Sequence, residues 1–99
     1  MSISKQYLKT KPVCKVTFTV PAEEAKKVAV VGDFNNWKEN KGSALKKLKN
    51  GIFKGTIELP KETKYEFKYL IDGNYVNEPE ADGYQWNDFA GAENAILEL

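Results

Sequence analysis

The chain has 99 residues, of which 41% are hydrophobic and 29% are charged, and its formal net charge is +1. This length suits one domain with a single core, and the ordinary composition excludes collagen-like and disordered chains. No apolar run approaches the roughly 18 residues of a membrane span, and the near-neutral charge provides no electrostatic basis for binding nucleic acid. We therefore expect a globular domain that binds neither nucleic acid nor membrane.

Two residue types are missing altogether. The sequence has no histidine and no arginine, so all fifteen basic residues are lysines. Their absence excludes Ser–His and Cys–His nucleophiles, histidine-ligated metals and the guanidinium fork that recognises phosphate. The lone Cys14 cannot form an internal disulfide, and no zinc-ligand cluster is present. Residues 1–5 lack the apolar stretch of a secretory signal, so we expect a cytoplasmic protein without a cofactor.

Charge is distributed unevenly along the chain. Residues 1–49 contain eleven lysines and four acids, whereas residues 50–99 contain four lysines and ten acids. Because these charges alternate with strand patterns and do not form a separate tail, we interpret them as solvated faces of the domain.

The first strand pattern begins at Val13. Residues 1–12 are polar and predict a flexible N-terminal segment, which leaves residues 13–99 for the folded domain. Residues 13–20 alternate with a period of two, the pattern of a half-buried strand, and Pro21 ends it because proline cannot donate to a ladder. Residues 22–27 are compatible with one helical turn or a polar loop.

A β-branched apolar run follows at residues 28–31 and predicts a central strand. Residues 32–37, Gly-Asp-Phe-Asn-Asn-Trp, form a dense turn signal. Leu45 and Leu48 indicate a short strand, and the Asn-Gly pair at residues 50–51 is a strong hairpin signal before a strand at residues 52–59.

The pattern in the last third of the chain predicts two more strands and a short strand that pairs back on the first of them. Residues 65–71 alternate, an Asp-Gly turn follows, and residues 74–77 can return as a short strand. Residues 78–91 are polar and glycine-punctuated, which indicates a long ordered loop before a final strand at residues 94–99. About seven short strands with little helix predict an all-β, antiparallel β-sandwich of the immunoglobulin-like class.

Aromatic residues make up 12% of the chain and fall into two groups. Those at alternating strand positions are expected in the core: Phe18, Phe53, Tyr65, Phe67 and Tyr69. Four others lie in or beside turns: Trp37, Tyr75, Tyr84 and Trp86. The second group either caps the ends of the sandwich or forms a platform, because an exposed ring matches the apolar C–H face of a pyranose sugar.

Polar residues near these turns allow the same two interpretations. Asn35, Asn36 and Asn94 carry paired donors and acceptors that suit vicinal diols, but asparagine also forms turns, which is the favoured role for Asn35. Lys68 lies on the strand face opposite Phe67 and can donate to sugar oxygens or remain a solvated lysine.

Acidic residues crowd the predicted loop at residues 78–91. A glycosidase needs two carboxylates about 5–9.5 Å apart in a cleft, which a sandwich of this size rarely builds. No EF-hand spacing supports calcium binding. We interpret the cluster as a solvated loop and expect no catalysis; it comprises Glu78, Glu80, Asp82 and Asp88.

Three sequence blocks together resemble a known family. Residues 28–38 read VAVVGDFNNWK, residues 65–75 read YEFKYLIDGNY and residues 91–96 read GAENAI. In order and spacing they are similar to carbohydrate-binding module family 48, over about residues 13–99. That family includes the glycogen-binding domain of the AMP-activated protein kinase beta subunit and the early-set domain N-terminal to the catalytic barrel of isoamylases. The whole chain resembles small stand-alone bacterial versions of this domain.

The resemblance implies an early-set sandwich that binds α-glucan, with glucose rings stacked on loop aromatics. Trp37 matches the stacking tryptophan of the first block, and Tyr75 stands where the family has a second one. Lys68 matches a lysine that hydrogen-bonds the sugar, and Asn94 matches an asparagine that contacts sugar hydroxyls.

The third block departs from the family pattern. Ala90 and Ala92 stand where the family uses leucine and threonine, which removes apolar reach and a hydroxyl. The leading hypothesis is a non-catalytic module that binds glycogen, starch or maltooligosaccharides, in some settings beside a glycan-active enzyme or kinase. The alternative is a protein-interaction or scaffold module that docks through an apolar patch around Leu70 and Val76, with any hydrolase activity belonging to the barrel of fused relatives.

Overall fold

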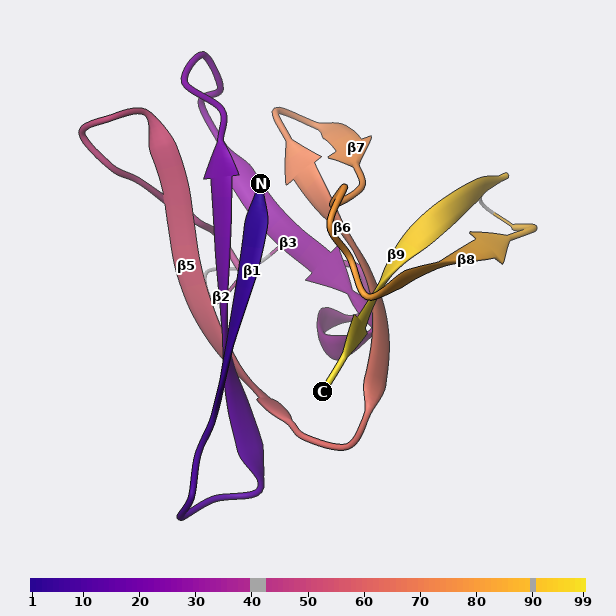
Figure 1. Cartoon of the computed structure of the whole chain (residues 1–99). Coiled ribbons are helices and arrows are strands. Elements are labelled where there is room, and N and C mark those ends of the chain that lie inside the picture. The colour runs from indigo at the N-terminus through magenta and orange to yellow at the C-terminus, as the bar shows by residue number, and fades with distance from the viewer. Residues whose placement is uncertain (40–42, 90) are drawn as a thin grey trace.

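The computed structural model describes residues 1–39, 43–89 and 91–99. Within them, two antiparallel sheets face each other, which confirms the predicted β-sandwich (Figure 1). Sheet A has the strand order β1 (Ser2–Tyr7), β2 (Val13–Pro21), β5 (Ile52–Pro60) and β4 (Lys46–Lys47). Sheet B has the order β3 (Val28–Gly32), β6 (Lys64–Ile71), β9 (Ala92–Glu98) and β8 (Gly83–Asn87), with β7 (Asn74–Val76) paired to β6.

The predicted strands form where alternation and turn signals place them. The longest ladder pairs β2 with β5 in a register that runs from Val13 opposite Pro60 to Pro21 opposite Ile52. The short strand expected between Leu45 and Leu48 is β4, and the Asn-Gly turn joins it to β5. Gly51 supplies the left-handed conformation of that turn, with φ at +81°.

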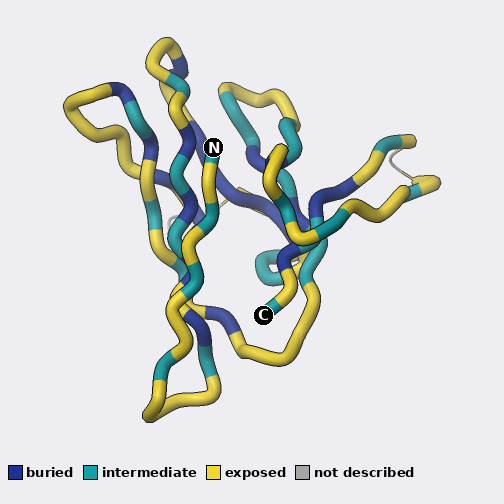
Figure 2. Tube along the Cα trace, viewed as in Figure 1, coloured by how far each residue is buried: buried dark blue, intermediate teal, exposed yellow. Residues whose placement is uncertain are grey.

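Three aromatic rings hold the two sheets together. The centroid of Phe18 on β2 lies 5.7 Å from that of Phe67 and 6.1 Å from that of Tyr69, both on β6. All three side chains are fully buried, and the buried residues lie mainly on β2, β3, β5, β6 and β9, whereas the tips of the β1–β2 and β6–β7 hairpins are exposed (Figure 2). The predicted core is confirmed, with Phe53 buried and Tyr65 half-buried against it.

The N-terminal segment differs from the flexible stretch predicted for residues 1–12. Ser2–Tyr7 forms β1, which pairs with β2 over six residues and makes the edge of sheet A. The backbone supplies these hydrogen bonds, so a polar sequence can form the strand without an obvious apolar pattern. Lys5 also joins it to sheet B, because its Nζ donates to Asp82 Oδ2 (2.6 Å) and to the carbonyl oxygen of Glu98 (2.8 Å).

Two further segments refine the sequence prediction. The stretch at residues 78–91 is not all loop, because Gly83–Asn87 forms β8 and pairs with β9. Residues 22–27 form a loop without a helix, and the Asp72 carboxylate fixes it by accepting hydrogen bonds from the backbone amides of Lys26 and Lys27. Among the described residues, no helix has the length and apolarity needed to span a membrane.

Gly32, at the end of β3, occupies a position with no room for a side chain. A Cβ built there would lie 2.5 Å from the carbonyl oxygen of Glu66 and 2.8 Å from Phe67 Cβ. We expect Gly32→Ala to lower the free energy of unfolding by about 1–3 kcal/mol, the usual cost of overpacking, measured by urea denaturation. Gly83→Ala is the matched control, since its Cβ would meet nothing closer than 3.8 Å; equal losses in both variants would contradict the prediction.

The Lys5–Asp82 contact predicts an acid-dependent part of the stability. Partial burial raises the pKa of Asp82, but the hydrogen bonds from Lys5 and the Glu98 amide and the Lys5 charge outweigh it, leaving that pKa below its ordinary value. A lowered folded-state pKa stabilises the fold above the unfolded-state pKa, and this contribution is lost as pH falls through the folded-state pKa. Asp82→Asn should therefore be less stable than wild type near neutral pH and show a shallower loss below pH of about 4 in thermal melts. Parallel pH profiles for the two proteins would contradict this assignment.

Candidate functional site

The turn after β3 is built by asparagine and ends in a strained conformation. It contains η1 (Asp33–Asn35), where Asn35 Oδ1 accepts from the Gly32 amide (2.9 Å) and Asn35 Nδ2 donates to the Val30 carbonyl (3.0 Å). The turn role favoured for Asn35 is thus confirmed. Asn36 and Trp37 then adopt left-handed conformations, with φ of 56° and 59°. Asparagine tolerates this region, whereas for a tryptophan it costs on the order of 1 kcal/mol or more and marks the turn as a functional candidate.

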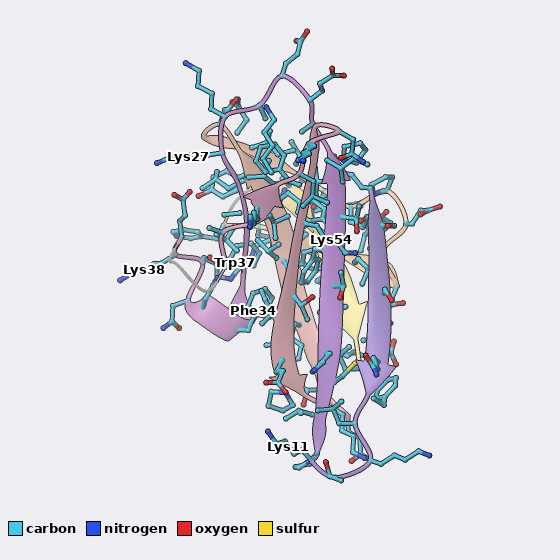
Figure 3. All side chains as sticks on the ribbon, turned by 90° about the vertical axis from the view of Figure 1, so that its left-hand side faces the viewer. Lys11, Lys27, Phe34, Trp37, Lys38 and Lys54 are labelled. Atoms are coloured by element: carbon cyan, nitrogen blue, oxygen red, sulfur yellow. The ribbon has the colours of Figure 1, made fainter. Side chains whose placement is uncertain are left out.

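One aromatic contact orients the turn on sheet B, and a hydrogen bond within the turn holds Trp37. Phe34 packs edge-on against Tyr65, with ring centroids 5.9 Å apart, and Figure 3 shows Phe34 beside Trp37 at this turn. The half-buried indole of Trp37 donates from Nε1 to Asp33 Oδ1 (3.2 Å). Trp37 is therefore held by its own turn and has no place in the buried core.

The outer face of sheet B carries the next residues. Phe67 and Tyr69 point into the core, so strand alternation sends Lys68 to the opposite face. Tyr75 on β7 lies opposite Leu70 in the register and is 61% exposed. On β9, Asn94 is almost fully buried and donates from Nδ2 to Glu66 Oε1 (3.0 Å).

These residues surround one groove of about 660 Å³. Its described lining combines ring faces, amides and one cation, listed in chain order as Trp37, Lys68, Tyr75, Asn87, Phe89, Ala92 and Asn94. Four of the five site residues predicted from the sequence therefore meet in it, and Asn36 is the one outside this lining. Ala92, which replaces the family threonine, also lines the groove, whereas Ala90 lies outside the described residues.

Besides Ala92, two lining residues were not predicted as site residues. Phe89 follows β8 with its side chain fully exposed, and Asn87 ends the same strand opposite Ala92. Both reach the groove because β8 pairs with β9, which carries Asn94. The signal in the sequence is the alternation of Tyr84 and Trp86 with polar neighbours, which is the period of a strand.

The other two loop aromatics are placed elsewhere. Tyr84 and Trp86 lie on the face of β8 opposite to Asn87, and neither belongs to the described lining of the groove. The Tyr84 hydroxyl donates to the Glu78 carbonyl (2.6 Å), and the Trp86 indole donates to Asp88 Oδ1 (2.6 Å). Trp86 nevertheless remains 55% exposed, so it is a solvent-facing tryptophan away from the groove.

Three of the four acids expected in a solvated loop, Glu78, Asp82 and Asp88, accept hydrogen bonds within the fold. Glu78 is fully buried, which corrects that expectation for this residue, and its carboxylate accepts from the Tyr69 hydroxyl (2.8 Å) and the Glu80 amide (3.0 Å). Burial, the hydrogen bond to Glu78 and its negative charge together raise the pKa of Tyr69 well above its ordinary value, so the phenol stays protonated. None of the described groove-lining residues is an acid.

The lining of the groove is therefore suited to bind a neutral, polyhydroxylated ligand. Ring faces can bury apolar C–H surface, and the amides of Asn87 and Asn94 offer donors and acceptors. Within the described residues, no group of histidine, cysteine and carboxylate side chains could hold a metal ion. A β-sandwich with such a groove on one sheet has the architecture of a carbohydrate-binding module.

Comparison with known proteins supports this class. Residues 15–99 match the family model described as the glycogen recognition site of AMP-activated protein kinase, and the chain therefore belongs to that family of carbohydrate-binding modules. It is also similar to the 1,4-alpha-glucan branching enzymes GlgB of Oceanobacillus iheyensis (34% identity) and Bacillus cytotoxicus (33% identity). These alignments cover 72% and 74% of the chain but only 14% of each enzyme.

The exposed ring of Phe89 leads to a prediction about the stability of the domain. Phe89→Ala should change the free energy of unfolding by less than about 0.5 kcal/mol, because the side chain is fully exposed. The same substitution at the fully buried Phe67 should cost about 3–5 kcal/mol. Urea denaturation of both variants checks this, and a loss above about 1 kcal/mol at Phe89 would mean that its ring is packed in solution.

Proposed function

We propose that this module binds α-glucan in the groove on sheet B, with glucose rings stacked on Trp37 and Tyr75. One observation carries the proposal: the side chains that match the family's sugar-binding positions, although far apart in sequence, line the same groove. Lys68 and Asn94 would hydrogen-bond sugar hydroxyls, and Phe89 would add a third apolar surface. The similarity to enzymes named for 1,4-alpha-glucan supports the choice of ligand.

The chemistry of a pyranose fits this arrangement. Stacking removes apolar surface of both ring and sugar from water, while the equatorial hydroxyls stay hydrogen-bonded at the rim. The amide of Asn94 gives one N–H to Glu66 and retains a second N–H and oxygen lone pairs for a ligand. One or two stacked rings with a few hydrogen bonds predict a Kd of about 10 μM to 1 mM after the cost of association. On a branched polymer, several such sites act together through multivalency.

We further propose that the module is not itself an enzyme. The buried Glu78 and the ion-paired Asp82 are engaged in the fold, and the described groove lining has no carboxylate. The branching activity in the names of the relatives belongs to proteins about seven times longer than the aligned region. A cytoplasmic location and a glycan-active enzyme or kinase as partner remain predictions of the same proposal.

Removing the main stacking ring tests the function. Trp37→Ala should weaken binding of maltoheptaose at least tenfold, about 1.4 kcal/mol, in isothermal titration calorimetry, because the groove loses its indole ring. Retention on a glycogen-containing gel should fall in parallel. Circular dichroism should confirm that the variant keeps its fold, as expected for a side chain outside the core.

Trp86→Ala is the matched control, because it removes the other tryptophan, which is more exposed than Trp37 and is not part of the described groove lining. It should bind maltoheptaose as wild type does. An unchanged titration for Trp37→Ala, or no retention of wild type on glycogen, would overturn the proposal. The protein-interaction alternative would then be tested at the half-buried Leu70, which lies opposite the exposed Tyr75. The patch expected around Leu70 and Val76 does not form as one surface, because Val76 lies opposite the buried Tyr69 and so takes the other face of the sheet.

A further inference from the structure

We propose that Asp33 is a positioning residue of the groove, which it serves by fixing the Trp37 indole to the central strand of sheet B. The inference rests on the proposed function, since it concerns how the same groove is preorganised. The Asp33 carboxylate accepts two hydrogen bonds with separate oxygens, from Trp37 Nε1 to Oδ1 (3.2 Å) and from the Glu66 backbone amide to Oδ2 (2.8 Å). One exposed side chain thereby connects the turn after β3 with β6.

The connection continues to the other side of the groove. Glu66, whose amide Asp33 binds, uses its own Oε1 to accept from Asn94 Nδ2 (3.0 Å) on β9. Lys68 follows two positions later on the same outward face of β6. Trp37, Lys68 and Asn94 are thus all positioned relative to the same segment of β6, although they come from three separate parts of the chain.

The turn needs such a connection because its backbone alone does not fix the ring. Trp37 has a left-handed φ of 59°, its amide donates to the Gly32 carbonyl (2.9 Å), and its side chain is only half-buried. An indole held at one N–H loses rotamer freedom before a ligand arrives, so less entropy is lost on binding. Asparagine cannot replace this carboxylate, because one of its two terminal atoms is an NH₂ group that would face an N–H donor.

The test compares two carboxylates that each bind a tryptophan. Asp33→Asn should weaken maltoheptaose binding about three- to tenfold, the usual effect of one misaligned hydrogen bond. Asp88→Asn is the matched control, because Asp88 binds the Trp86 indole (2.6 Å) outside the groove, and its affinity should equal that of wild type. The chain has only two tryptophans, so each indole N–H gives a separate nuclear magnetic resonance signal. Asp33→Asn should shift the Trp37 signal and speed its exchange with water, and Asp88→Asn should do the same only to the Trp86 signal.

A double-mutant cycle separates positioning from general support of the fold. In the Trp37→Phe background, which lacks the indole donor, adding Asp33→Asn should cause less than about half of its loss of affinity in wild type, since the two groups act through one another. An equal loss in both backgrounds would overturn the inference, as would unchanged affinity in Asp33→Asn beside a shifted Trp37 signal. If Asp33→Asn fails to fold, Trp37→Phe can be tested by itself. That variant removes the indole N–H that Asp33 accepts from, while the hydrogen bond between the Glu66 amide and Asp33 remains. Failure of wild type to bind maltoheptaose would instead reject the proposed function and, with it, the ligand-positioning role.

Discussion

Strand β6 is the element on which both the core and the candidate site depend. Its inward side chains, Phe67 and Tyr69, meet Phe18 of the opposite sheet with ring centroids 5.7 and 6.1 Å apart. Because successive residues of a strand point to opposite faces, burying those two rings forces Glu66 and Lys68 outward. A slip of one residue would move the lysine into the core and the aromatic rings into water. The aromatic contact therefore stabilises the sandwich and sets the register on which the groove relies.

The groove combines a strained turn with a rigid sheet. Asn35 closes the turn on backbone groups of β3, and Gly32 lets that strand approach the Glu66 carbonyl more closely than any side chain would permit. Asn36 and Trp37 adopt left-handed backbone conformations in this arrangement, and these conformations cost conformational free energy. The sheet offsets that cost through hydrogen bonds from neighbouring strands, so a surface tryptophan can be held without being buried.

A few charged side chains connect segments of this small domain. Lys5 joins the edge strand of sheet A to Asp82, and the Asp72 carboxylate fixes the loop before β3. Glu78 lies buried against Tyr69 and organises the segment that leads to β8. These three acids are thus bound within the fold, and the described lining of the groove is neutral apart from Lys68.

Much of the fold follows from local patterns in the sequence. Alternation identified β2 and β6 and the faces they bury, the Asn-Gly pair identified the β4–β5 hairpin, and three motif blocks identified Trp37, Lys68, Tyr75 and Asn94 as candidates. These features are local, because the period of two and the turn preferences of asparagine and glycine act within a few residues.

Pairing between distant segments was decided only by the tertiary structure. Ser2–Tyr7 forms β1 although most of its residues are polar, since backbone hydrogen bonds need no particular side chain, and Ile3 packs against the core. The pairing of β8 with β9 brings Asn87 and Phe89 into the groove and leaves Trp86 outside it, although both aromatics stand in the same polar segment of the sequence. The hydrogen bond from the Glu66 amide to the Asp33 carboxylate likewise joins residues 33 positions apart. Sequence period determines which face a side chain takes, but which strands become neighbours depends on how the whole chain buries its core.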